Sequence, residues 1–336
     1  PEFRGTEDRP IVIRAFEGAE VLFDGAATVD PKGLAPVTDP AERARLAASA
    51  ADHVLATTIT NQALMAKFSE KLMLNLSIDG KNYLPSVFPN EGYARLKPNP
   101  AVHEVSPPAV PVGKEDYGIR AGCPPYQEPG KPLGWKGTME EPRGAHAWIG
   151  HRADEMAGTW PQWAAEINRN NRRNALTGFI EANWLLSSQP VVGADGEKQT
   201  IHLSRALGYG WAWRKKDLQC KMFGLLCELD HPGEWHFDPL TNRLYIYPPE
   251  TVSGETVISL PVAPGFLALE GTKHVSVMGL SVRNGGGGSV YRIGGSHNLV
   301  ASCSIRSCTA IGVELGGTHN ALRGCDLVDL NRHVVL

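Results

Sequence analysis

A repeat close to the end of the sequence constrains the fold more than any other feature. Three segments align on His274, His297 and His319, which are spaced 23 and then 22 residues apart. Apolar and polar residues alternate within each segment, as in a strand with one buried side. Three aligned columns are apolar in every copy: Val277, Val300 and Leu322; Leu280, Cys303 and Cys325; and Val282, Ile305 and Leu327. The repeat therefore predicts stacked copies of one β-structured unit, in which each segment is a strand.

A second short strand precedes the later copies, beginning at Ser289 and at Ile311, and a Gly-Gly pair follows each one. A unit of this length cannot enclose a core alone, but units stacked about 4.8 Å apart can. The pattern predicts a parallel β-solenoid. A leucine-rich repeat is the alternative fold with a repeat of this length. It needs an asparagine ladder and a Leu-rich segment that leads the chain back to the next strand. In this sequence the segment that leads back is rich in glycine and contains a second strand, which favours the solenoid.

The aligned histidines raise the question of a metal site. They precede the strands at a turn, where a column of identical residues is more typical of a structural stack, so we predict no metal and no cofactor. The six cysteines show no CxxC and no zinc-ligand spacing. We expect them to be free, buried or inert thiols, with Cys303 and Cys325 as small core residues.

The stretch "PIVIRAFEGAEVLFDG" contains two more short strands and resembles a first rung of the same solenoid. The repeat then disappears until about residue 264, so a long insertion separates this rung from the later ones. We predict a first rung at 1–29, an inserted β-rich domain at 30–262 and solenoid coils at 263–336. The last coil is incomplete, because "NRHVVL" has only begun the next one, and we expect a fragment or mature form truncated at its C-terminal end.

The insertion has patterns of its own. Asp39, Pro40 and Glu42 form a capping signature that predicts a short helix. The other expected elements are a hairpin with an Asp-Gly turn at 71–90, a helix at 159–171 capped by Thr159, a meander at 176–203 with turns at Gly193–Gly196, and a hairpin at 233–250 around Asp238–Arg243. The insertion is thus predicted to be an antiparallel β-sandwich or small barrel with one or two short helices. The whole chain is predicted to be all-β.

Composition excludes some classes of function. Lys and Arg number 33 and Asp and Glu number 36, so the net charge is −3, which argues against a nucleic-acid binder. No run of 18 apolar residues occurs, so we expect no membrane span. The oligomeric state is left open.

Several blocks in fixed order resemble a known family: "GTEDRPIVIRAFEGAEVLFDG", "LSIDGKNYLPSVFPNEGYA", "LTGFIEANWLLSSQPV", "ELDHPGEWHFDPLTNRLYIYPP" and the "HVSVMGLSVRN" coils. The chain resembles the pectate-lyase-like, right-handed parallel β-helix proteins. Within them it is most similar to bacterial β-helix glycosidases of the fucosidase and xylanase type, with an inserted β domain. The resemblance implies a secreted or periplasmic carbohydrate-active enzyme whose substrate cleft lies along a sheet of the solenoid.

Glycoside hydrolysis needs two carboxyl groups across the scissile bond, about 5–5.5 Å apart for retention and about 6.5–9.5 Å apart for inversion. Neighbouring coils place outward side chains about 5 Å apart, so this fold can supply such pairs. The candidate catalytic residues are Glu314, Asp326 and Asp329. Asp326 is expected on the outward face and Asp329 at the turn that follows. Solvated surface carboxylates remain the alternative interpretation.

A polysaccharide lyase is the second enzyme hypothesis, because it would use Arg or Lys next to a uronate. Arg283 and Arg306 form an outward column with Arg292 nearby, although surface charge also explains them. Trp211 and Trp213 are candidates for stacking on sugar rings, with core packing as the alternative. A third hypothesis is a non-catalytic glycan-binding or adhesion solenoid. All three hypotheses imply a polysaccharide or oligosaccharide of plant or algal type as the partner.

Overall fold

A computed structural model describes residues 3–70, 75–98, 146–150, 160–169, 174–182, 185–197, 199–203, 218–286, 288–308 and 311–330. The chain divides into two compact units. The first consists of Pro1–Leu34, Ile59–Leu84 and Thr251–Leu336, and the second of Ala35–Thr58 and Pro85–Glu250. Strands make up most of the regular structure in the described residues, as predicted for an all-β chain. None of the helices in these ranges is long and apolar enough to cross a membrane.

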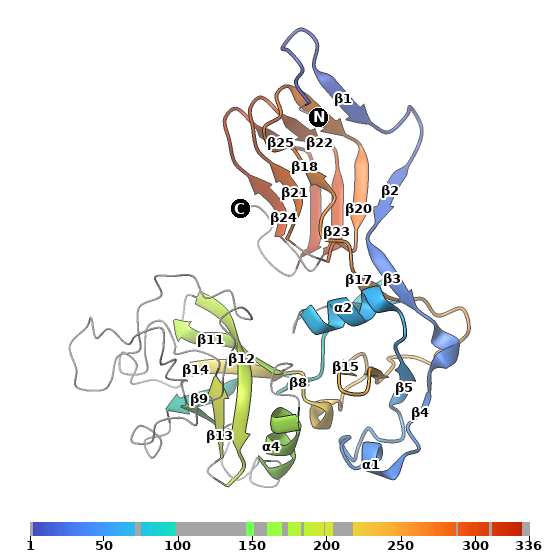
Figure 1. Cartoon of the computed structure of the whole chain (residues 1–336), viewed down its shortest axis with the longest axis vertical. Coiled ribbons are helices and arrows are strands. Elements are labelled where there is room, and N and C mark those ends of the chain that lie inside the picture. The colour runs from blue at the N-terminus through green and yellow to red at the C-terminus, as the bar shows by residue number, and fades with distance from the viewer. Residues whose placement is uncertain are drawn as a thin grey trace, which may run out of the picture. The chain divides into compact units, whose positions relative to one another are not determined.

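Three parallel sheets form most of the first unit, and the chain passes through them in turn to make one coil after another (Figure 1). Sheet A consists of β1 (Ile11–Arg14), β19 (Val275–Met278), β22 (Leu299–Ala301) and β25 (Ala321–Arg323). Sheet B consists of β2 (Val21–Asp24), β20 (Leu280–Arg283), β23 (Ser304–Cys308) and β26 (Asp326–Leu330). Sheet C consists of β18 (Leu267–Ala268), β21 (Ser289–Ile293) and β24 (Ile311–Leu315).

The register of these sheets confirms the columns predicted from the repeat. Val277 pairs with Val300, which pairs with Leu322, and the column of Val282 is formed in the same way. The two strands expected near the start of the chain are present, and β1 pairs in parallel with β19 and β2 with β20. The inward columns form one continuous apolar core. The cysteines in the described part of the chain are free thiols, and Cys303 is buried in this core.

The prediction that each histidine segment is a single strand was wrong. Each segment is two short strands that belong to sheets A and B. The bend between them falls at Gly279, Ser302 and Gly324, whose φ values of 66°, 51° and 57° are left-handed. The buried positions are odd-numbered before the bend, at Val275 and Val277, and even-numbered after it, at Leu280 and Val282. This break in the alternation is visible in the sequence and indicates the bend.

An asparagine ladder lines the corner between sheets C and A. The Oδ1 of Asn298 accepts a hydrogen bond from the Val275 amide at 3.0 Å, and the Oδ1 of Asn320 accepts one from the Asn298 amide at 2.9 Å. Each amide nitrogen donates within its own coil, to Gly294 O at 2.7 Å and Gly316 O at 2.6 Å. The sequence argument had assigned such a ladder only to the rival repeat, but any sharp corner with free backbone amides can use one.

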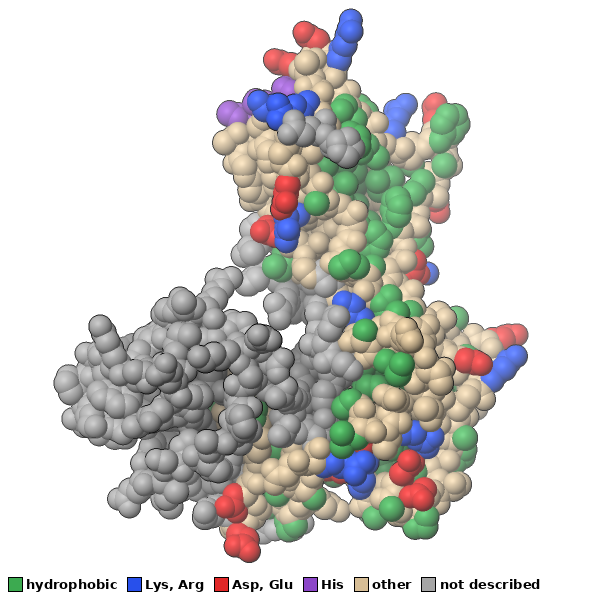
Figure 2. Space-filling view, viewed as in Figure 1, with side chains coloured by type: hydrophobic (Ala, Val, Ile, Leu, Met, Phe, Trp, Pro, Cys, Tyr) green, Lys and Arg blue, Asp and Glu red, His purple; other side chains and the backbone are tan. Residues whose placement is uncertain are grey.

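The histidines stack, as the structural interpretation predicted. The ring centroids of His274 and His297 are 4.8 Å apart, and those of His297 and His319 are 4.6 Å apart, with interplanar angles of 19° and 9°. All three residues have a left-handed φ. Figure 2 shows histidine side chains gathered at one edge of this unit.

An antiparallel sheet completes the first unit. It consists of β3 (Ala26–Val29), β17 (Ile258–Pro261), β6 (Leu76–Ile78) and β7 (Lys81–Tyr83). The predicted Asp-Gly turn joins β6 to β7, with φ values of 48° at Asp79 and 79° at Gly80. A helix that was not predicted, α2 (Gln62–Glu70), begins where the Asn61 side chain accepts from the Ala63 and Leu64 amides.

A closed ring of antiparallel strands forms the larger part of the second unit. Its strands are β11 (Asn174–Ala182), β12 (Leu185–Asp195), β13 (Thr200–Leu203), β10 (His146–Gly150), β9 (Ala94–Pro98) and β14 (Leu218–Phe223), with β8 (Val87–Phe88) at the side of β14. Because β11 also pairs with β14, the ring closes into a small barrel, one of the two predicted architectures. The turn predicted at Gly193–Gly196 lies later, because β12 continues to Asp195 past a bulge near Gly193.

Helix α4 (Trp160–Arg169) packs on the core of this barrel through Trp160, Trp163 and Ile167, and it confirms the second predicted helix. Its expected cap, Thr159, lies outside the described residues. The first predicted helix is the short α1 (Pro40–Arg43), in which the Asp39 side chain accepts from the Glu42 amide at 2.8 Å.

A second sheet of this unit contains the predicted hairpin. Its strands are β15 (Trp235–Asp238), β16 (Arg243–Ile246), β5 (Leu55–Thr58) and β4 (Ala35–Pro36). Short 3-10 turns occur at η1 (Pro31–Gly33) of the first unit and η3 (Leu226–Glu228) of the second.

We predict that the corner glycines tolerate alanine very differently. Gly295 and Gly279 have φ values of 68° and 66°, but a Cβ on Gly295 would lie 2.1 Å from Thr272 O, whereas one on Gly279 meets nothing within 4 Å. Gly279→Ala should cost about 1 kcal/mol from left-handed strain alone. Gly295→Ala should cost at least about 3 kcal/mol, because the clash is with backbone. Urea unfolding followed by circular dichroism measures both, and equal losses would contradict the stacked corner.

Candidate functional site

The predicted site residues fall on two different outer faces of the first unit. Arg283, Arg306 and Asp326 point outward from sheet B, whereas Arg292 and Glu314 belong to sheet C. The structure therefore brings together some of the predicted carboxylates and arginines but not all of them. Trp211 and Trp213 lie outside the described residues.

The sheet B face carries four charged side chains, those of Asp24, Arg283, Arg306 and Asp326. The first three lie in one column of the parallel register, whereas Asp326 lies in the neighbouring column, opposite Ser304. Asp24 accepts from Arg283 Nε at 2.8 Å and from Asn284 Nδ2 at 2.8 Å. Partial burial opposes ionisation of Asp24, but these hydrogen bonds hold its pKa below the ordinary value. Asp24 is therefore an ionised partner that fixes the Arg283 guanidinium.

Arg306 is held much less firmly than Arg283. Its Nε donates to Ser304 Oγ on the same strand at 2.9 Å, and its Nη2 lies 3.8 Å from Asp326 Oδ2. Arg283 and Arg306 are directly opposite each other in the parallel register, which places like charges next to each other. Both guanidinium groups remain about half exposed. This part of the face offers donors for an anionic or hydroxyl-rich ligand, with the Asp326 carboxylate beside them.

Asp329 lies within β26 and not at the turn that follows it, where the sequence predicted it. Its φ of 53° matches that of Ser307 one coil earlier, and Asn284 has a φ of 59° in the coil before that. Asn, Ser and Asp tolerate left-handed backbone better than most residues. Asp326 and Asp329 are both exposed and share β26.

The sheet C face carries a second charged column. Arg292 lies between two carboxylates, with Nη1 3.1 Å from Glu270 Oε1 and Nε 3.2 Å from Glu314 Oε2. Hydrogen bonds from Ser289 and Arg292 lower the pKa of Glu314, so this carboxyl group is a poor proton donor. The sequence reasoning missed Glu270, although it lies 22 residues before Arg292, just as Arg292 lies 22 residues before Glu314.

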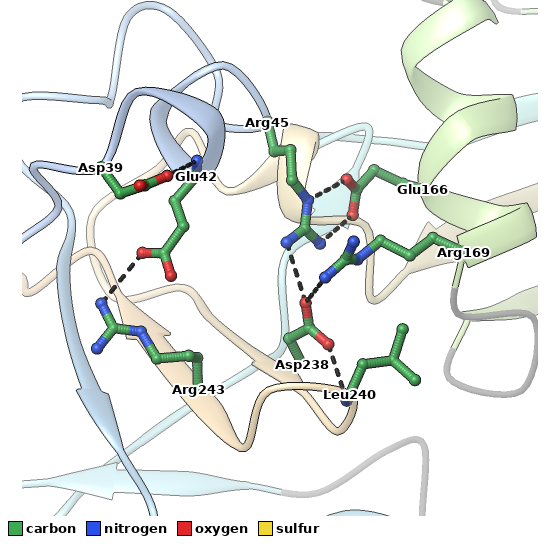
Figure 3. A network of polar contacts seen from close by, with 8 residues as sticks. All are labelled: Asp39, Glu42, Arg45, Glu166, Arg169, Asp238, Leu240 and Arg243. Atoms are coloured by element: carbon green, nitrogen blue, oxygen red, sulfur yellow. Dashed lines mark hydrogen bonds and ion pairs between the residues drawn. The ribbon is translucent and has the colours of Figure 1, made fainter.

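The second unit contains a buried ionic network (Figure 3). Arg45 binds the Glu166 carboxylate through Nε at 2.6 Å and Nη2 at 2.9 Å, and its Nη1 binds Asp238 Oδ2 at 3.0 Å. Arg169 also reaches Asp238 Oδ2, at 3.3 Å, and the Leu240 amide donates to the other Asp238 oxygen at 3.0 Å. The Asp238 side chain is fully buried.

The charged groups of this network are bonded to one another or to backbone amides. Burial disfavours the charged form of Asp238, but the hydrogen bond from Arg45 and the Leu240 amide keep its pKa below the ordinary value. Arg45 follows α1, Glu166 and Arg169 belong to α4, and Asp238 ends β15, so the network joins three elements of the unit. Its role is structural, which agrees with the prediction of a structural hairpin around Asp238.

Two other carboxyl groups of this unit, those of Glu228 and Glu234, are buried and accept hydrogen bonds from neutral donors. Glu228 accepts a hydrogen bond from Trp163 Nε1, and burial raises its pKa to about 7. Glu234 accepts from the amides of Val87, Asp230 and His231, but burial still raises its pKa to about 8. Both groups hold a loop in place, and both hold a proton more tightly than an exposed glutamate does.

An open depression lies between α4 and the turn after β12. Pro161, Ala164, Asn168 and residues 194–197 line it. The Asn168 side chain is already occupied, because it exchanges two hydrogen bonds with the backbone of Ala194. None of the predicted site residues lies here. Among the residues that the structure describes, no group of three or more His, Cys, Asp or Glu side chains is arranged to hold a metal ion.

Comparison with known proteins shows a shared fold at very low sequence identity. No family model and no curated protein matches the sequence. A solved structure described as "Glycoside hydrolase" covers 95% of this chain with a TM-score of 0.52 and 9% identity. Another, "The complex structure of XylC with xylose", covers 98% at 9% identity, but its TM-score of 0.38 carries no argument. The chain spans 56% of the first structure and 46% of the second.

We predict that removing Arg45 destabilises the second unit strongly. Arg45→Met removes the cation bound to the buried Glu166 and leaves Asp238 with only the longer contact to Arg169, so the free energy of unfolding should fall by about 3 kcal/mol or more. Asp52→Asn is the control, since it removes the charge from an equally short 2.6 Å pair, between Arg43 and Asp52, whose carboxylate is exposed. It should leave stability almost unchanged. Similar losses in the two variants, measured by urea unfolding, would show that the network is not needed.

We also predict a pH dependence that comes from Glu228. Its pKa of about 7 in the folded protein lies above the ordinary 4.5, so folding takes up a proton between these values. The contribution of this group to stability is therefore greatest at low pH and falls as the pH rises through 7.

Glu228→Gln keeps an acceptor for Trp163 and cannot ionise. It should raise the free energy of unfolding by about 3 kcal/mol more at pH 8 than at pH 4.5. Glu197→Gln removes an exposed carboxylate and controls for net charge. Thermal unfolding across this pH range provides the measurement, and parallel curves for Glu228→Gln and the unsubstituted protein would refute the assignment.

Proposed function

We propose that this chain is part of a carbohydrate-active protein of the right-handed parallel β-helix class, and that the protein is a glycoside hydrolase. The observation that carries the proposal is the sheet B face, where Asp326 lies beside the incompletely paired Arg306. The fold shared with a chain described as a glycoside hydrolase supports it. Because this chain spans 56% of that structure, the activity is assigned to the protein that contains the chain.

In this proposal residues 1–29 form the first rung, 30–262 an inserted β-rich domain and 263–336 the later coils. The three parallel sheets, whose successive strands after the insertion are offset by 22 to 24 residues, support the β-helix assignment. A glycan laid along the coil axis crosses successive strands of sheet B, so each coil presents its outward side chain to a different part of the sugar chain. Secretion or a periplasmic location follows from the same class of enzyme.

The catalytic step requires one carboxyl group that donates a proton and one carboxylate that acts as nucleophile or base. Asp326 and Asp329 share one strand, so a single bound glycan reaches both. Glu314 belongs to the other face, and its lowered pKa suits a carboxylate rather than a proton donor. We therefore assign the reaction to Asp326, with Asp329 beside it, and assign hydroxyl binding to Arg283 and Arg306.

A polysaccharide lyase is the second candidate, and the stacked Arg283 and Arg306 favour it. Two cations directly opposite each other suit the carboxylate of a uronic acid. A hydrolase and a lyase differ in their products, because a lyase leaves an unsaturated sugar that absorbs ultraviolet light, whereas a hydrolase adds water and leaves a saturated one.

We expect the protein that contains this chain to release reducing sugar from a plant or algal polysaccharide without unsaturated product. Asp326→Asn should lower kcat at least about 100-fold, since it removes an acid or base from the reacting bond. Glu314→Gln on the sheet C face is the control and should retain activity.

The outcomes separate the hypotheses. Unsaturated product would replace hydrolase with lyase, and retention of glycan without turnover would replace both with a binding module. Full activity in Asp326→Asn with loss in Glu314→Gln would keep the hydrolase and move its site to the sheet C face.

A further inference from the structure

Two thiols in the core of the first unit lie in the same inward column of consecutive coils. Cys303 and Cys325 immediately precede Ser304 and Asp326, which pair in sheet B. The Asp326 amide donates to Cys303 O at 2.9 Å, and the Cys303 amide lies 3.5 Å from Cys325 Sγ. Neighbouring strands lie about 4.8 Å apart, which falls within the Cα separations of about 4.4–6.8 Å that disulfides span.

The two side chains have the same orientation. Cys303 Sγ lies 3.8 Å from Val277 O, and Cys325 Sγ lies 3.8 Å from Val300 O, which is the equivalent carbonyl one coil later. The Cys325 sulfur already leans toward the Cys303 backbone. Rotation of the Cys303 side chain toward the later coil therefore brings the two sulfur atoms together without a change of register.

The rotation exchanges contacts of the Cys303 thiol. Its Sγ lies 3.3 Å from Ala301 O, and the buried Tyr291 hydroxyl lies beside it. Burial and the neighbouring thiols raise the pKa of this phenol, so it stays neutral. Among the described residues Cys325 is less deeply buried than Cys303, so we assign it as the member of the pair that reacts first.

We propose that Cys303 and Cys325 form a disulfide that joins consecutive coils of the first unit under oxidising conditions. The Cys325 thiolate attacks a small-molecule disulfide and releases one thiolate, which leaves a mixed disulfide on Cys325. The Cys303 thiolate then attacks the Cys325 sulfur, forms the bond between the coils and releases the second thiolate. The two cysteines lose two electrons and two protons, and the small-molecule disulfide becomes two thiols.

The rate of this reaction depends on pH. Burial raises the pKa of Cys325, so little thiolate is present near neutral pH. The rate of oxidation is accordingly higher in mildly alkaline solution. If the oxidant reacted only with unfolded protein, the rate would not depend on the pKa that Cys325 has in the folded protein.

The test is peptide mapping after treatment with oxidised glutathione. Trypsin cuts after Arg292, Arg306, Arg323 and Arg332, so Cys303, Cys308 and Cys325 fall in three separate peptides. We expect a cross-linked species of the Cys303 and Cys325 peptides that has lost two hydrogen atoms and disappears with dithiothreitol. The oxidised protein should also show a Tm higher by about 5 °C.

Cys308 provides a matched control in the same core. It is stacked between Gly285 and Leu330, so no cysteine lies above or below it. Cys308→Ser should keep the cross-link and the rise in Tm, whereas Cys325→Ser should lose both. Absence of the cross-linked species in the oxidised protein, or its persistence in Cys325→Ser, would overturn the proposal.

Discussion

The backbone hydrogen bonds between consecutive coils are the interaction on which the first unit depends. They hold each strand in parallel register with its equivalent one coil away, so every side chain lies above a residue from the same position of the repeat. One residue type repeated in a column then becomes a continuous feature. The valine core, the stacked imidazole rings, the asparagine ladder and the outward charges all follow from this register.

The second unit is stabilised in a different way. Its barrel closes through one pairing, between β11 and β14, and its helices are tied to a hairpin by buried charges rather than by repetition. A closed barrel has no free edges, which protects its strands from association. The ionic network has no repeating pattern, so its members depend on specific partners such as Arg45, which binds both Glu166 and Asp238.

Sequence patterns predicted the features that come from short-range periodicity. The apolar columns, the strands that begin at Ile11 and Val21, the Asp79-Gly80 turn and the Asp39 cap were all visible in the sequence. The bends at Gly279 and its equivalents were missed because the change of inward parity was read as continuous alternation. The pairing of Arg45 with Glu166 spans 121 residues and leaves no local signal. The separation of Glu314 from Asp326 onto two faces depends on the corners, which the periodicity does not show.

The functional account depends on which outer face a glycan occupies. The sheet B face presents Arg283 and Arg306 in one column with Asp326 beside Arg306, while the cation of the sheet C face is already bound by two carboxylates. A crystal structure of the protein with a bound oligosaccharide tests this most directly. The account predicts a sugar chain along sheet B, with hydroxyl or carboxylate oxygens within hydrogen-bond distance of Arg306 and the Asp326 carboxylate. A sugar bound only on the sheet C face, or only on the second unit, would contradict it.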